Sequence, residues 1–127
     1  MRDIKFRQAI FKDGKFDRFH YWGYVGHKEE FIGPINISGI NLPYDVRGSD
    51  QFIDKKDYND NDLWENDIIK DVDGDILLVT WNRLRVRFSL KHEDGSMFGY
   101  HFGSIDKGAP FHRIGNIHED KELFRGV

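Results

Sequence analysis

Three Asp-Gly pairs divide this sequence into short runs rich in β-branched and aromatic residues: Asp13-Gly14, Asp73-Gly74 and Asp94-Gly95. An Asp-Gly pair between two such runs is a strong hairpin signal, because both residues tolerate the positive φ angles of a tight turn. The pairs predict hairpins over residues 3–25, 67–81 and 84–105. No long run has helical periodicity, so the sequence predicts an all-β fold that is mainly antiparallel.

The choice of apolar residues supports the same fold class. The 127-residue chain has thirteen Ile and eleven Phe but only two Ala. Ala favours helices, whereas β-branched and aromatic side chains suit the half-buried surface of a pleated sheet. With 39% apolar residues, the chain can build a hydrophobic core and fits a single domain.

The sequence also predicts how the chain is organised. The polar stretch 54–62 is rich in turn-forming residues. We expect a loop at 49–61 to join an N-terminal β-layer, residues 1–48, to a barrel-like part, residues 62–127. Within the second part, Ile76–Trp81 is apolar on both faces, which predicts a strand covered on both sides.

A capping pattern lies near the C-terminus. Asn116 precedes Glu119 by three residues, which is the spacing of a capping box. This pattern predicts one short helical turn in an otherwise all-β chain.

Charge and composition exclude several classes of protein. The net charge of -3 argues against a surface built wholly to hold nucleic acid, although it allows a local basic stripe. The chain has no Cys, so disulfides and thiolate metal sites are excluded. The N-terminus has no apolar run of the signal-peptide type, and no segment is long enough to span a bilayer. We expect a protein that is soluble in the cytoplasm of the cell that makes it and has no membrane partner.

Two acidic segments resemble metal sites only superficially. The first holds three alternating carboxylates, Asp71, Asp73 and Asp75. It lacks the Gly at position six and the Glu at position twelve that a calcium loop requires, and a hairpin turn explains the same residues. The second segment, 57–62, is either a solvated polar loop or a weak cation site. We therefore predict no specific metal site.

The sequence contains no recognisable catalytic motif. None of its six His residues has a compact ligand spacing, and there is neither a nucleophile elbow nor a phosphate-binding loop. We predict no catalytic residues and no cofactor. An enzyme hypothesis would need His101, Asp67 and Glu65 to meet in one cleft. The simpler interpretation is that the two acids fix a turn while Trp64 and Ile68 enter the core.

A basic stripe is the most specific local feature. Strand periodicity places four cationic side chains on one face of a strand: Arg83, Arg85, Arg87 and Lys91. Neighbours on that face stand about 7 Å apart, which is similar to successive phosphates of an extended single strand. Trp81 and Tyr100 are nearby stacking surfaces for bases. The alternative is an exposed strand face whose arginines pair with acidic residues or with another subunit.

Three phrases stand in this order along the chain: MRDIKFR at residues 1–7, DLWENDII at residues 62–69 and IGNIHEDKEL at residues 114–123. Together they resemble one known family, the YopX-like proteins of phages and prophages. The resemblance implies a phage origin, expression in a bacterial cytoplasm and an SH3-like barrel element in the C-terminal half, but it implies no chemistry. The family-motif residues that we single out are Trp64, Glu65, Asp67, Gly115 and Asn116.

Three glycines of the family's central phrase are replaced in this chain. Asp54, Asp60 and Asn66 stand at those positions. Asp and Asn are the residues other than Gly that best tolerate a left-handed backbone, so we predict that the turns persist.

Taken together, these features favour a non-enzymatic phage or prophage protein that acts by binding. We expect a homo-oligomer or a complex with a host or phage protein, and nucleic-acid binding through the basic stripe is the alternative. The first predicted hairpin is crowded with aromatic residues: Phe11, Phe16, Phe19, Tyr21, Trp22 and Tyr24. We expect most of these rings in the core and some against another chain.

Overall fold

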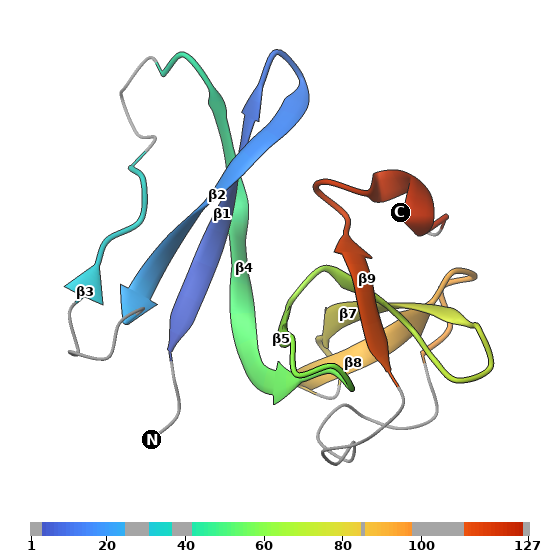
Figure 1. Ribbon diagram of the computed structural model, residues 1–127. Helices are drawn as coiled ribbons and strands as arrows, with labels where there is room; N and C mark the ends of the chain where they lie inside the picture. The colour runs from blue at the N-terminus through green and yellow to red at the C-terminus, as the bar shows by residue number, and fades with distance from the viewer. Residues whose placement is uncertain (1–3, 25–30, 37–41, 85, 98–110, 126–127) are drawn as a thin grey trace. The chain divides into compact units, whose positions relative to one another are not determined.

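The computed structural model describes residues 4–24, 31–36, 42–84, 86–97 and 111–125. Within these residues the fold is all-β, with nine strands and one short 3₁₀ helix (Figure 1). The strands form a five-stranded sheet of order β3-β2-β1-β4-β5 and a four-stranded sheet of order β8-β7-β6-β9. The strand pairs whose register is defined are antiparallel, which confirms the predicted fold class.

The chain divides into two compact units. Unit 1 is Met1–Phe52 and unit 2 is Ile53–Val127. Unit 1 holds three whole strands and most of a fourth: β1 (Lys5–Lys12), β2 (Lys15–Tyr24), β3 (Phe31–Ile32) and β4 (Asp45–Lys56). Unit 2 holds the end of β4 and the remaining elements: β5 (Asp62–Trp64), β6 (Asp67–Lys70), β7 (Ile76–Asn82), β8 (Arg87–His92), β9 (His112–Asn116) and the 3₁₀ helix η2 (Lys121–Leu123).

All three Asp-Gly pairs form turns. Asp13 and Gly14 have φ angles of 52° and 77° and join β1 to β2, as a tight hairpin turn requires. The second pair joins β6 to β7. After the third pair, Met97 bridges back to Lys91, but residues 98–105 of the predicted returning strand lie outside the described residues.

A buried ion pair lies in the sheet of unit 1. Arg7 on β1 is directly opposite Asp50 on β4, and its Nε donates to Asp50 Oδ2 at 3.0 Å. The two side chains are only 2% and 3% exposed. The Arg7 guanidinium also stacks on the ring of Phe19, 4.4 Å from its centroid. Two contacts, one from β4 and one from β2, thus hold this charged side chain in place.

The other face of this sheet is held by side-chain amides and rings. The Gln8 side chain donates to the Ile35 carbonyl at 3.2 Å and accepts from the Ile35 N–H at 2.7 Å. This pair of bonds imitates strand pairing and fixes the segment that follows β3. Trp22 stacks on Phe6 at 4.3 Å, and its Nε1 donates to Ser49 Oγ at 2.9 Å.

The four-stranded sheet of unit 2 buries apolar side chains on both faces. One cluster comprises Ile53, Leu63, Ile69, Leu77, Val79, Leu90 and Phe111. A second cluster comprises Ile68, Leu78 and Phe124, with Ile76 and Ile117 packed against it. Strand β7 supplies residues to both clusters, so the predicted cover on both sides is confirmed for Ile76–Val79, whereas Trp81 at the end of the predicted strand is exposed. The described strands of unit 2 form an open sheet, in which the barrel is not closed.

The predicted loop at 49–61 is wrong for much of its length. Strand β4 runs through Asp45–Lys56, and only the segment from Asp57 to Asn61 forms the turn to β5. Residues 54–56 are polar because they are exposed, while Phe52 and Ile53 are buried. A strand with exposed polar residues at its end has the same composition as a loop, so composition alone misplaced the boundary.

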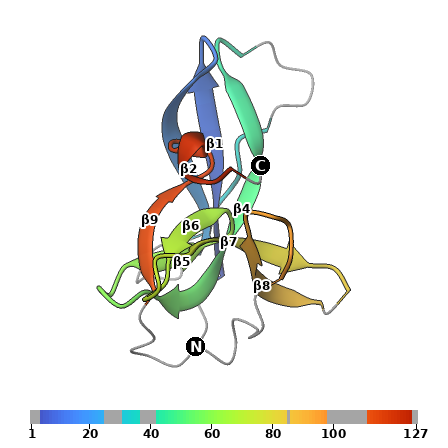
Figure 2. The same cartoon turned by 90° about the vertical axis from the view of Figure 1, so that its right-hand side faces the viewer.

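The predicted continuous strand through the basic stripe is also wrong. Strand β7 ends at Asn82 and β8 begins at Arg87, and these two residues face each other across a hairpin. The Asn82 Oδ1 accepts the N–H of Leu84 at 3.1 Å, which starts the turn. Figure 2 shows this hairpin pointing away from β9 within unit 2.

The capping pattern near the C-terminus forms in part. Asn116 Oδ1 accepts the N–H groups of His118 and Glu119, each at 3.0 Å. The Glu119 carboxylate accepts from the Asn116 side-chain amide, while Asp120 Oδ2 accepts the Asn116 N–H at 3.4 Å. Asp120 therefore takes the place that a capping box gives to Glu119. The predicted short helical turn is present as η2, and its N-cap residue is Asp120 rather than Asn116.

The buried ion pair gives a stability prediction. Arg7→Ala should lower the free energy of unfolding by about 3–5 kcal/mol, because it leaves the Asp50 carboxylate buried without its counter-charge. The matched control is Lys12→Ala, which removes an exposed cation from β1, the strand that also holds Arg7. The Lys12 ammonium is 4.0 Å from the Asp17 carboxylate on β2. It should cost at most about 1 kcal/mol. Urea unfolding followed by tryptophan fluorescence measures both, and equal losses would contradict the assignment.

Candidate functional site

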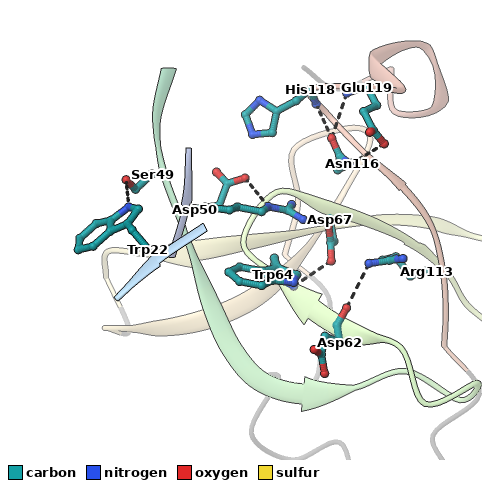
Figure 3. A network of polar contacts seen from close by, with 11 residues as sticks. Trp22, Ser49, Asp50, Asp62, Trp64, Asp67, Arg113, Asn116, His118 and Glu119 are labelled. Atoms are coloured by element: carbon teal, nitrogen blue, oxygen red, sulfur yellow. Dashed lines mark hydrogen bonds and ion pairs between the residues drawn. The ribbon is translucent and has the colours of Figure 1, made fainter. Parts of the chain in front are cut away.

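The family-motif residues on β5 and β6 build a tight turn. Asp67 is fully buried, and its Oδ2 accepts the N–H of Trp64 at 2.8 Å (Figure 3). Asn66 has a φ of 70°, in the left-handed region that Asn tolerates. Trp64 is buried, and half-buried Glu65 lies between it and Asn66. Asp67 therefore fixes the turn while Trp64 enters the interior, as the simpler interpretation of the sequence predicts.

The second group of motif residues lies at the end of β9. Asn116 is directly opposite Asp67 in the pairing of β9 with β6, and its side chain organises the turn that follows (Figure 3). A Cβ at Gly115 would overlap Asp120 Oδ2, so a larger residue there would displace the carboxylate that accepts the Asn116 N–H. The two family phrases thus meet at one end of the sheet of unit 2.

Backbone bonds from Asn66 complete this junction. Its N–H donates to the Val79 carbonyl on β7 at 2.8 Å, and its carbonyl accepts the Ile117 N–H, just after β9, at 3.1 Å. One residue of the turn therefore connects three parts of unit 2. The arrangement is architectural: its polar groups hold strands together.

The enzyme hypothesis gains no geometry from the described residues. It needs His101 beside Glu65 and Asp67, and His101 lies outside the described residues. The Asp67 carboxylate bonds the backbone of its own turn. A shared cleft for these three residues therefore stays an untested prediction.

Asp57 is a polar anchor that the sequence-based interpretation missed. Its Oδ1 accepts the N–H groups of Asn59 and Asn61 at 3.0 and 2.8 Å. Its Oδ2 accepts the Asn61 side-chain amide at 3.1 Å and the Arg113 N–H at 2.8 Å. The spacing Asp-x-Asn-x-Asn was the available signal, since Asp side chains commonly bond N–H groups two to four residues on. The carboxylate ties the β4–β5 turn to β9.

The other acidic segment, which holds Asp71, Asp73 and Asp75, is organised in a similar way. Asp71 Oδ1 accepts the N–H groups of Asp73 and Asp75, each at 2.9 Å, so its carboxylate stabilises the hairpin turn. The hairpin explanation of these residues is thereby supported. Among the residues that the structure describes, no group of three or more His, Asp or Glu side chains is arranged to hold a metal ion.

The tip of the β7–β8 hairpin combines exposed apolar and cationic side chains. We call the described residues 82–84 and 86–87 the hairpin tip. Leu84 is 94% exposed and Val86 is 71% exposed. Arg83 and Arg87 are exposed beside them, and neither has an ion pair within the described part of the chain. Val86 has a φ of 53°, which a β-branched residue rarely adopts.

The hairpin rearranges the predicted basic stripe. Arg83 lies in the turn, and Arg87 and Lys91 lie on one face of β8 about 13 Å apart. Trp81 is on the opposite face, where its ring packs edge-on against Phe88 at 5.0 Å. The remaining members of the proposed surface, Arg85 and Tyr100, lie outside the described residues.

The aromatic residues of the first hairpin are only partly buried. Phe11 is buried, and Phe16, Phe19 and Trp22 are half-buried, whereas Tyr21 and Tyr24 are exposed. Tyr24 belongs to a group of exposed apolar side chains at the end of the sheet, which we call the strand-end patch: Ile4, Tyr24 and Phe31. The rings of Tyr24 and Phe31 are 5.5 Å apart, and the Tyr24 N–H donates to the Ile4 carbonyl at 2.9 Å.

The Asp57 anchor predicts a pH dependence. Burial acts to raise the pKa of Asp57, but hydrogen bonds from Arg113, Asn61 and Asn59 outweigh it and hold the pKa below its usual value. The charged carboxylate therefore stabilises the fold above its unfolded-state pKa. This contribution is lost as the pH falls through the lower, folded-state pKa.

Asp57→Asn should cost about 1–3 kcal/mol at neutral pH, because the amide presents an NH₂ group to backbone donors. It should also flatten the loss of stability in acid. Asp60→Asn, at an exposed position of the same turn, is the matched control and should change neither quantity. Urea unfolding between about pH 3 and pH 7 tests this. An unchanged acid limb in Asp57→Asn would refute the role of the anchor.

Among the residues that the structure describes, no helix has the length and apolar character needed to cross a membrane.

Comparison with known proteins gives a match that includes these motif residues. No curated protein matches this chain. A family model described as YopX protein matches residues 46–125, which is more than half of the chain. This match contains the β5–β6 turn and the end of β9, where two of the family phrases meet. The chain therefore belongs to the YopX protein family.

Proposed function

We propose that this protein is a non-enzymatic binding module, encoded by a phage or prophage and acting in the bacterial cytoplasm, and that it self-associates. The observation that carries this proposal is the strand-end patch of unit 1. Its three apolar side chains come from the residue before β1, the end of β2 and the start of β3. Phe31 alone is 58% exposed. No member of the patch carries a charge.

The position of the patch at a sheet edge supports a second copy as its partner. β3 is the last strand in its sheet and pairs with β2 over only two residues, Gly23 and Tyr24. An edge strand presents unpaired backbone N–H and C=O groups, and exposed apolar side chains beside them favour contact with another chain. A two-fold dimer would bury each patch against its own copy. Each fully buried aromatic side chain contributes about 1.5–3 kcal/mol to such an interface.

Self-association predicts a concentration-dependent dimer. Phe31→Ser should raise the dimer dissociation constant by about tenfold or more, since it removes the largest apolar group of the patch. Tyr58→Ser removes an equally exposed aromatic side chain from unit 2 and should leave the constant unchanged. Analytical ultracentrifugation and native mass spectrometry measure both.

A wild-type protein that stays monomeric at every concentration would refute self-association. A monomer that instead retains a specific bacterial protein from lysate, and loses it on Phe31→Ser, would assign the patch to a host partner. The circular dichroism spectrum of Phe31→Ser should match that of the wild type, which separates lost binding from lost folding.

A second candidate function is nucleic-acid binding through the hairpin tip. The observation that favours it is the state of Arg83 and Arg87, which have no ion pair within the described residues. The pairing with acidic residues that would make these arginines structural is absent there. Residues 82–92 also contain no carboxylate, although the whole chain has a net charge of -3. A local cationic surface on an acidic chain attracts a polyanion through that surface alone.

This second function predicts binding that depends steeply on salt. Removing one phosphate contact, as in Arg87→Ala, should lower the affinity for nucleic acid and reduce the salt slope by about one. Lys70→Ala, at an exposed cation on β6, is the matched control. Fluorescence anisotropy between about 50 and 200 mM salt measures the slope. Equal affinity across that range would exclude the function.

A further inference from the structure

The β7–β8 hairpin forms a two-stranded ribbon that extends beyond its sheet. β6 pairs with β7 only over Ile76–Leu78. Further along, Trp81 with Phe88 and Asn82 with Arg87 join β7 to β8, and no third strand pairs with them among the described residues. Ser89, the next residue along β8, is already buried. The ribbon and its turn point away from β9 (Figure 2). Two pairs span about 7 Å, and a two-stranded ribbon fits the major groove of a duplex.

The hairpin tip carries an exposed apolar side chain between two exposed cationic side chains. Leu84 is almost fully exposed at the turn, and its neighbour Arg83 and the first residue of β8, Arg87, flank it. At 94% exposure the Leu84 side chain is almost entirely in contact with water. Full burial of a Leu side chain is favourable by about 1.5–3 kcal/mol. Proteins that deform duplexes commonly insert one such apolar side chain between base pairs.

We propose that the hairpin tip binds double-stranded nucleic acid, with Leu84 inserted between adjacent base pairs and with Arg83 and Arg87 on the flanking phosphates. This inference rests on the second candidate function above and names its ligand and its contact. The guanidinium groups supply affinity, because planar donors match phosphate oxygens. The apolar side chain supplies a preference for steps that unstack easily.

The geometry favours a duplex over a single strand. Proteins that bind single strands combine a cationic groove with aromatic platforms on the same surface. Here Trp81 packs against Phe88 on one face of the ribbon, while Arg87 is on the other face. The cations and the ring therefore do not form one continuous surface for stacked bases.

The charge of the whole chain favours a groove over a flat anionic surface. The chain has 22 acidic residues and 19 Lys and Arg residues. A flat anionic bilayer would bring many of those carboxylates close to its own charge. A ribbon that enters a groove meets the polyanion with its tip alone.

The test uses the full chain and a duplex of about 20 base pairs that carries 2-aminopurine at a TA step. Insertion unstacks the probe, so wild-type protein should raise its fluorescence and bind with a steep salt dependence. Leu84→Ala should abolish the fluorescence rise and weaken binding by about tenfold, with an unchanged salt slope. Val72→Ala removes an exposed aliphatic side chain from the β6–β7 turn, at the other end of β7, and should change neither readout.

The outcomes separate the inference from the function on which it rests. Salt-dependent duplex binding without a fluorescence rise, or with an equal rise in Leu84→Ala, would overturn the wedge and keep nucleic-acid binding. Tighter binding to the matching single strand would overturn the duplex assignment. Binding only to phosphatidylglycerol vesicles, or to no nucleic acid, would overturn both. Arg83→Ala supplies the converse control, because it should reduce the salt slope and keep the fluorescence rise at saturation.

Discussion

The buried carboxylate of Asp67 is the constraint on which the architecture of unit 2 depends. It accepts the Trp64 N–H and holds the β5–β6 turn, in which Asn66 is left-handed. Because Asn66 then bonds β7 through Val79 and the end of β9 through Ile117, one turn aligns several strands. A fully buried carboxylate is tolerated only where donors satisfy it, so the turn and the charge depend on each other. Two of the family phrases meet at this junction, where their side chains and backbone groups stabilise the fold.

This conclusion moves attention from the motif residues to the surface. Asp57, Asp67, Asp71 and Asn116 all direct their oxygen atoms to backbone N–H groups. They are the polar residues that a search for catalytic or metal sites would select first. Their bonds show that a small β-domain with short strands needs side chains to fix its turns. The strand-end patch and the hairpin tip are exposed instead, and we propose both as binding surfaces.

Much of the fold follows from local sequence, because the signals act over a few residues. The Asp-Gly pairs predicted their turns since a tight hairpin turn needs positive φ angles. Asp54, Asp60 and Asn66 replace family glycines and have φ angles of 57°, 66° and 70°, as predicted from their tolerance of a left-handed backbone. The apolar run Ile76–Trp81 predicted burial on both faces. The turn after Asn116 was also visible, although Asp120 rather than Glu119 completes it.

Other features were decided only by the tertiary structure. The alternation of Arg with Leu and Val from residue 83 to 87 satisfies the period of a strand, so it could not reveal that the chain reverses there. The pairing of Trp81 with Phe88 and the bond from Asn82 to Leu84 decide the reversal. It turns a predicted flat stripe into a projecting tip with Leu84 at its end. The sequence by itself determined the class of fold and its turns, because those depend on neighbouring residues. Which apolar side chains stay in water depends on pairings between distant strands, and only the folded chain sets these.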